Sequence, residues 1–274
     1  MKIKVIAEIG INHKGSLKKA KTLINDACIA GAWAVKFQFR SKNKNYNKLT
    51  QIGDEILDKE FKRSFIEFSN LIELSKYAKK LNLKTGISFF NVNEFNKYFR
   101  FINHFDFLKV PSSEFLNLKL YDSFLKANKQ IMISCGGHNS KQIKSRIKLL
   151  KKNTVVMHCV SNYPTIIGFQ NLNFLNTLSK FQHIDIGYSS HDKNWEVNII
   201  AMQMKVKYIE RHLTLDKKGD GLDDSSSSDK LEFYKLCFFA NNFDRILGKK
   251  EKIINQGEII NMQNLGTSIF SIKT

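Results

Sequence analysis

Two histidines at the ends of predicted strands are the residues of this chain whose type and spacing most clearly indicate chemistry. His191 follows the short apolar stretch 183–188, and His212 follows the stretch 206–211. Parallel strands that alternate with helices bring their carboxyl ends to one rim, so both imidazoles are expected to lie there together. Neutral imidazole binds Mn, Fe and Zn alike, so the pair predicts a metal site without naming the metal. The alternative is two unrelated polar residues at strand ends.

A lysine inside an apolar strand is the second indication of a site. In the stretch 34–38, alternation places Lys36 and Gln38 on one face and Val35 and Phe37 on the other. A lysine that faces a protein interior needs an anionic ligand or a carboxylate partner, and Glu8 is the obvious partner. Lys109 recurs in the same way on a later strand. Two such lysines among several serines favour a small ligand with a phosphate and a carboxylate, held beside a divalent metal.

The elements that would position these residues alternate along the chain, with no obvious linker before about residue 250. Short apolar or β-branched stretches predict strands at 3–9, 33–38, 83–88, 106–110, 130–134, 154–159, 183–188 and 206–211. Between the first two, Ser16 is a suitable helix N-cap, Leu17 to Ala27 keep an apolar stripe, and Gly31 ends the helix. Eight strand-then-helix units predict an α/β protein, a (β/α)8 TIM barrel. An open doubly wound sheet is less favoured, because G-x-G-x-x-G is absent after the first strand.

Active sites of such barrels collect at the carboxyl ends of the strands. The polar residues expected there are Glu8, Asn12, His13, Lys36, Gln38, Ser88, Lys109, Ser112, Glu114, Ser134, His158, Ser161, Asn162, Ser189, His191, Arg211 and His212. The turn Gly136–Gly137 could offer N–H groups to a phosphate, although short glycine turns are common. The serine-rich segment 225–228 is predicted to be a flexible loop that could act as a lid.

Composition excludes several other classes of protein. The net charge is +19, but the lysines are spread along the chain and accompany apolar residues at helical spacing, which is typical of solvated helix faces. We therefore expect no nucleic-acid partner, while the charge favours an anionic substrate. No stretch of about 18 apolar residues and no signal sequence is found, so no membrane association is expected. Four scattered cysteines are typical of reduced thiols in a cytoplasmic protein.

Six segments in register carry a family resemblance. They are residues 7–15, 35–38, 109–114, 158–165, 187–191 and 210–216. In order and spacing they resemble the sialic acid synthase family, the phosphoenolpyruvate-condensing enzymes that make N-acetylneuraminate and related nonulosonates. The resemblance covers residues 3 to about 245. It implies a transferase of carbohydrate biosynthesis that condenses phosphoenolpyruvate with an N-acylated hexosamine, similar to N-acetylmannosamine, and releases phosphate.

The resemblance also implies roles for individual residues. Glu8, Lys36 and Lys109 match catalytic positions, and His191 and His212 match the ligands of a divalent metal, Mn2+ or Mg2+. The positions that match phosphoenolpyruvate or sugar contacts are Gln38, Ser88, Ser112, Glu114, Ser134, Asn162, Tyr163, Ser189 and Asp223. A metal with two protein imidazoles keeps coordination positions for water and substrate.

The chain departs from the family pattern at four places. Phe89 and Phe90 stand where a small hydroxyl residue and a proline are usual, Ser190 replaces an aspartate, and Asp224 replaces a histidine. The fourth concerns the C-terminus: we expect a barrel over 1–250 and an extension over 251–274, without the family's antifreeze-like domain. In family members the antifreeze-like domain reaches the sugar site of the partner subunit. The resemblance therefore implies two kinds of partner: a second copy of this chain, and a separate protein that supplies the domain. A different acceptor, or a catalytically weak barrel that serves as an assembly partner, stays open.

Overall fold

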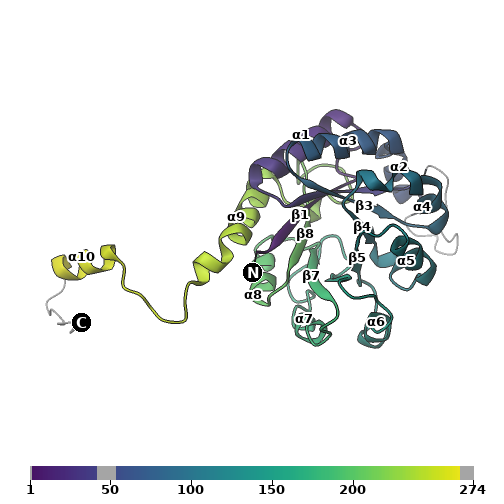
Figure 1. Ribbon diagram of the computed structural model, residues 1–274. Coiled ribbons are helices and arrows are strands. Elements are labelled where there is room, and N and C mark those ends of the chain that lie inside the picture. The colour runs from purple at the N-terminus through teal and green to yellow at the C-terminus, as the bar shows by residue number, and fades with distance from the viewer. Residues whose placement is uncertain (1, 42–53, 266–274) are drawn as a thin grey trace. The chain divides into compact units, whose positions relative to one another are not determined.

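The computed structural model describes residues 2–41 and 54–265, and its centre is a closed barrel of eight parallel strands in the order β1 to β8 (Figure 1). The strands are β1 Lys4–Gly10, β2 Ala34–Phe39, β3 Lys84–Phe89, β4 Phe107–Val110, β5 Gln130–Ser134, β6 Val155–His158, β7 Asp185–Ser190 and β8 Tyr208–His212. The predicted (β/α)8 barrel is confirmed, and β1 and β8 close it with Glu8 beside His212 in register.

Helices surround the barrel (Figure 1). They are α1 Leu17–Ala30, α2 Asp54–Arg63, α3 Phe68–Lys80, α4 Val92–Tyr98, α5 Leu118–Leu125, α6 Ser140–Ile147, α7 Phe174–Leu178, α8 Val197–Gln203 and α9 Lys230–Leu247. Short 3-10 turns cover Phe99–His104, Ser112–Glu114 and Asp224–Ser226. The predicted ends of α1 are confirmed: the Ser16 side chain accepts from the backbone N–H of Lys19, and Gly31 is left-handed with φ 81°.

Strand alternation divides the side chains into an outer and an inner core. Outward residues such as Val35 and Phe37 pack with the helices in the large core. Inside the barrel, a separate apolar layer consists of Ile6, Ala34, Phe107, Met132, Val155, Met157 and Tyr208. Gly86 makes room for this layer, because a Cβ there would lie 2.2 Å from the Phe107 ring. The apolar layer closes the barrel interior below the strand ends, so it is no pore.

The chain divides into two compact units, Met1–Phe243 and Asp244–Thr274. The first is the barrel with most of α9. The second holds the end of α9 and a helix α10, Gln256–Leu265. In the part of the chain that the structure describes, no helix combines the length and the apolar character needed to cross a membrane.

Candidate active site

A cavity of about 440 Å3 opens at the carboxyl ends of the strands, where the sequence predicts the site. Its lining residues are Glu8, Lys36, Gln38, Arg40, Ser88, Phe90, Lys109, Pro111, Ser112, Ser113, Ser134, Gly136, Gly137, His138, Ser161, Tyr163, Ser189, His191, Glu210 and His212. The volume lies within the range of small-molecule sites.

Four buried charges form the floor of this cavity. Lys36 forms an ion pair with Glu8, which is its register partner across β1 and β2. On the opposite side, Lys109 Nζ donates to both carboxylate oxygens of Glu210 at 2.9 Å. The two pairs are linked, since Lys36 Nζ lies 3.8 Å from Glu210 Oε1. The carboxylate partner expected as the alternative for Lys36 is therefore present, and it lines the same cavity.

Serines complete the hydrogen bonds of this charged floor. Lys36 Nζ donates to Ser88 Oγ at 2.9 Å, and Ser189 Oγ donates to Glu210 Oε1 at 3.1 Å. Burial lowers the pKa of Lys36 to about 7, with Lys109 acting in the same direction and Glu210 opposing it. Burial would raise the pKa of Glu210, but Lys109 and Lys36 outweigh it and hold that pKa below its ordinary value. The floor therefore has one amino group, that of Lys36, whose protonation changes near neutral pH.

The two histidines lie together at the ends of neighbouring strands: His191 directly follows β7, and His212 is the last residue of β8. Their ring centroids are 5.5 Å apart, and the Tyr163 ring lies 4.1 Å from the His191 ring. His191 Nδ1 is 2.8 Å from the carbonyl oxygen of Val160, so Nδ1 carries the proton and Nε2 keeps its lone pair. Burial, assisted by His212, lowers the pKa of His191 to about 3 and keeps the ring neutral.

The second histidine has a carboxylate beside it. His212 Nδ1 lies 3.2 Å from Asp223 Oδ2 and has no hydrogen-bond partner of good geometry among the described residues. Two imidazoles with a nearby carboxylate could hold a divalent metal, although these residue types do not select one metal. Within residues 2–41 and 54–265, no three His, Cys, Asp or Glu side chains are grouped as a ready ligand set. A metal held by this pair would therefore take its other ligands from water and substrate.

Comparison with known proteins agrees with this geometry. A family model described as the NeuB family matches residues 23–252. The chain belongs to the NeuB family. It is 29% identical to the N,N'-diacetyllegionaminic acid synthase of Campylobacter jejuni, over 98% of this chain and 84% of that protein. It is also 29% identical to the N-acetylneuraminate-9-phosphate synthase of Homo sapiens, over 97% of this chain and 77% of that one.

Solved structures give the same assignment. The crystal structure of N-acetylneuraminic acid synthetase from Leptospira borgpetersenii matches with a TM-score of 0.82 and 25% identity, over 96% of this chain and 91% of that chain. The family predicted from six sequence segments is therefore confirmed.

Most residues predicted for the site of this NeuB-family chain come together in the cavity. Those that line it are Glu8, Lys36, Gln38, Ser88, Lys109, Ser112, Ser134, Tyr163, Ser189, His191 and His212. Asp223 lies just behind His212. Two others are placed elsewhere: Glu114 accepts from Asn117 Nδ2 at 2.7 Å, and the Asn162 side chain is exposed.

The cavity also contains residues that sequence reasoning missed. Glu210 is the most important, because it pairs with one lysine and lies near the other. The alternation of β8 could have identified it, since Glu210 shares the inward face with Tyr208 and His212. Arg40 and Phe90 form one wall, with the guanidinium carbon 3.4 Å from the ring centroid. His138 also lines the cavity.

Some residues expected at the rim point the other way. The Arg211 side chain lies on the outer face of β8 and is fully buried there. The His158 ring faces outward and stacks on the Tyr188 ring, with the ring centroids 5.8 Å apart. Asn12 is structural, because its Nδ2 donates to Leu213 O and to Ser227 Oγ, both at 2.9 Å. Strand alternation explains the outward direction of Arg211 and His158, because neighbouring residues at a strand end face opposite sides of the sheet. Asn12 lies beyond the end of β1.

The lid predicted at 225–228 is wrong. Ser226, Ser227 and Ser228 are fully buried. Ser227 Oγ donates to Asp223 O at 2.6 Å, and the Ser228 N–H donates to His212 O at 2.9 Å. A serine run looks flexible by composition, but here its hydrogen-bonding groups are satisfied by the barrel, so it packs as part of the rim.

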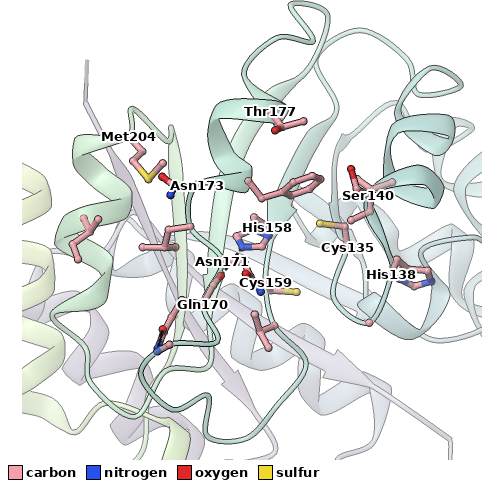
Figure 2. A pocket seen from close by; sticks show the side chains of 17 residues that line it. Cys135, His138, Ser140, His158, Cys159, Gln170, Asn171, Asn173, Thr177 and Met204 are labelled. Carbon is pink, nitrogen blue, oxygen red and sulfur yellow. Dashed lines mark hydrogen bonds between the residues drawn. The ribbon is translucent and has the colours of Figure 1, made fainter.

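A larger cavity of about 930 Å3 lies beside the active-site mouth (Figure 2). Figure 2 shows His158, Cys135 and Cys159 near its centre, and residues of α6, α7 and α8 complete its wall. It shares Gly137 and His138 with the mouth. No Lys, Arg, Asp or Glu is among its lining residues, whereas the smaller cavity has both buried lysine–glutamate pairs. The smaller cavity is therefore the candidate active site.

Proposed function

We propose that this chain condenses phosphoenolpyruvate with the open-chain aldehyde of an N-acylated hexosamine, giving a sialic-acid-type nonulosonate and phosphate. The observation that carries the proposal is the buried floor of Lys36, Glu8, Lys109 and Glu210 at the mouth of a NeuB-family barrel. Buried lysines suit an anionic substrate, because binding it adds the opposite charge at a place that water cannot reach.

The residues of the cavity fit the separate parts of that reaction. Lys36 and Lys109 hold the anionic groups of phosphoenolpyruvate and stabilise the phosphate as its bond to carbon 2 breaks. Ser112 and Ser134 line the cavity together with the Gly136–Gly137 turn and would hydrogen-bond the phosphate. Carbon 3 forms the new bond to the aldehyde carbon, and water adds at carbon 2. Glu8, beside Lys36, accepts the proton of that water. Gln38 and Asp223 are proposed for the sugar.

The histidine pair fits a divalent metal, Mn2+ or Mg2+. His191 offers a neutral Nε2, and His212 is oriented by its contact with Asp223. When bound there, the metal would polarise the aldehyde oxygen as a Lewis acid. The protein's part is to bury both rings and to keep His191 neutral, which follows from the low pKa of His191.

A different acceptor is a second candidate, favoured by the wall of Arg40 and Phe90. Phe90 stands where the family usually has proline, and it lines the cavity with Arg40 and Gln38. The departure from the family pattern at this wall is therefore on the side of the cavity proposed for the sugar. The lysine floor proposed for phosphoenolpyruvate keeps the residues of the family pattern.

The test is release of inorganic phosphate from phosphoenolpyruvate, with Mn2+ or Mg2+, across a panel of N-acyl hexosamines. We expect release that requires both substrates, with a new carbon–carbon bond in the product. Phosphoenolpyruvate binding without release for any hexosamine would favour the second candidate. A chain that binds no phosphoenolpyruvate would overturn both.

A further inference from the structure

The outer face of β7 and β8 holds a buried polar cluster directly behind the two histidines. Arg211, one residue before His212, is fully buried. Its Nη1 donates to the carbonyl oxygen of Asp192 at 2.6 Å and to Ser190 Oγ at 3.2 Å. Those residues lie on either side of His191. One guanidinium on β8 therefore contacts the residues on both sides of His191, through the backbone of Asp192 and the side chain of Ser190.

The same guanidinium also holds its own strand. Arg211 Nε donates to Ser228 Oγ at 3.0 Å, and the Ser228 N–H donates to the carbonyl oxygen of His212 at 2.9 Å. The backbone of His191 is fixed from a third direction, since its carbonyl oxygen accepts from the Thr165 N–H at 2.8 Å. The positions of both histidines thus depend on groups joined through Arg211.

Asp192 supplies the carboxylate of this cluster. Its Oδ2 accepts from Tyr188 Oη and from Ser190 Oγ, both at 2.7 Å. Asp192 is fully buried, so this negative charge is placed beside Arg211 where water cannot screen it. Ser190 is the position at which the family pattern has aspartate. In this chain Asp192, two positions later, supplies a carboxylate that accepts from the Ser190 hydroxyl.

We infer that Arg211 and Asp192 form a clamp that sets the relative position of His191 and His212, with Asp192 taking the place of an aspartate at position 190. Both are positioning residues, because they contact the backbone and hydroxyls around the histidines and do not line the cavity. The inference rests on the proposed function only for its consequence, which is metal binding and catalysis. The geometry it describes can be measured without metal or substrate.

The test compares Arg211→Met with a matched control, Arg146→Met. Arg146 on α6 is also a buried arginine, at 3% exposure, and its Nε donates to the carbonyl oxygen of Phe115 at 3.0 Å, away from the histidines. The first readout is long-range proton–nitrogen NMR of the His191 ring in the metal-free protein. We expect one Nδ1-protonated form in the parent and in Arg146→Met, and a mixture of tautomers in Arg211→Met as the bond to Val160 loosens.

The second readout is binding by calorimetry. Arg211→Met should weaken Mn2+ binding by about 10- to 100-fold, the usual effect of removing a group that orients a metal ligand, and leave phosphoenolpyruvate binding unchanged. An unchanged His191 ring in Arg211→Met, or an equal change in Arg146→Met, would overturn the inference while leaving the proposed function intact. Failure of the parent to turn over, with the NMR result as expected, would count against the proposed function alone.

A rescue variant tests the role of the carboxylate and does not depend on how well Arg211→Met folds. Asp192→Asn should show the same tautomer mixture as Arg211→Met. The double variant Ser190→Asp/Asp192→Asn, which returns a carboxylate to the neighbouring position, should restore the single Nδ1-protonated form. A double variant no better than Asp192→Asn would show that Asp192 does not replace an aspartate at position 190.

Discussion

Two layers of side chains fill the barrel, and they differ in kind although the same strands supply both. The lower layer is apolar and includes Ile6, Ala34, Phe107 and Tyr208. Two residues further along the same strands, the upper layer has Glu8, Lys36, Lys109 and Glu210. Because side chains alternate along a strand, residues two positions apart both face inward, and the later residue lies nearer the mouth of the barrel. The lower layer gains stability by burying apolar area, while the upper layer buries charges whose desolvation opposes their attraction.

This difference predicts that one substitution in each layer will lower the free energy of unfolding by a similar amount. Only the substitution in the upper layer should abolish phosphoenolpyruvate binding. Lys109→Met leaves Glu210 buried without its partner and should lower the free energy of unfolding by about 3–5 kcal/mol. It should also abolish phosphoenolpyruvate binding. Phe107→Ala, two residues earlier on β4, should cost about 3–5 kcal/mol through the cavity it leaves, and binding should survive.

Denaturant unfolding and titration calorimetry on the two variants measure these effects. If Phe107→Ala lost binding as completely as Lys109→Met, the two layers would not be separable. The lysine floor would then be only a sensitive reporter of barrel packing.

Removing both partners of the pair sharpens the comparison. The double variant Lys109→Met/Glu210→Met converts this part of the upper layer into an extension of the lower one. Replacing a buried ion pair by apolar groups is often neutral or stabilising, so the double variant should regain most of the stability that Lys109→Met loses. Binding of phosphoenolpyruvate should stay absent. Additive losses of stability in a double-mutant cycle would show that the pair is not the unit that matters.

The pH dependence of binding is a smaller effect of the same floor. Burial lowers the pKa of Lys36 to about 7, so the ammonium is charged below that pH and neutral above it. An anion binds the charged form, so affinity for phosphoenolpyruvate should fall as pH rises from 7 to 9, by at most about tenfold per pH unit for one proton. Calorimetry in buffers of different ionisation enthalpy should show proton uptake on binding. Lys36→Met should bind weakly and without this pH dependence; an unchanged slope would assign the proton to another group.

The sequence predicts the barrel and most of the cavity because both follow from alternation and strand ends. Lys36 is recognised from its place between Val35 and Phe37, and the family motifs add the serines and histidines. Glu210 was missed because it lies inside the stretch 206–211, which is predicted from the sequence to be an apolar strand, although alternation gives it the same inward face as His212. The long-range partners were beyond sequence reasoning: nothing local to Arg211 indicates that it holds the backbone around His191.

The loop after β8 shows the same limit. Asp224 stands where the family pattern has a histidine. In the structure its carboxylate accepts from Thr214 Oγ1 at 2.6 Å and pairs with Lys14 Nζ at 3.0 Å. The residue is therefore structural, and its partners come from segments far away in the sequence.

The smallest predicted effect concerns Asp220, an exposed residue that ties the loop bearing Asp223 to the rest of the rim. Its oxygens lie 2.7 Å from Lys14 Nζ and 2.5 Å from Arg63 Nη1. Hydrogen bonds from Lys14 and Arg63 lower the pKa of Asp220 from its ordinary 3.8 to about 2. Because the pKa is lowered in the folded state, the stabilisation is present above pH 3.8 and is lost as pH falls through 2. Asp220→Asn should therefore lower the melting temperature slightly at pH 7 and low salt. Both 1 M salt, which screens exposed charges, and a pH below 2 should remove the difference from the parent. Thermal melts over this grid of pH and salt measure it. A difference that survived in 1 M salt would mean that packing of the loop, and not its charges, holds Asp223 beside His212.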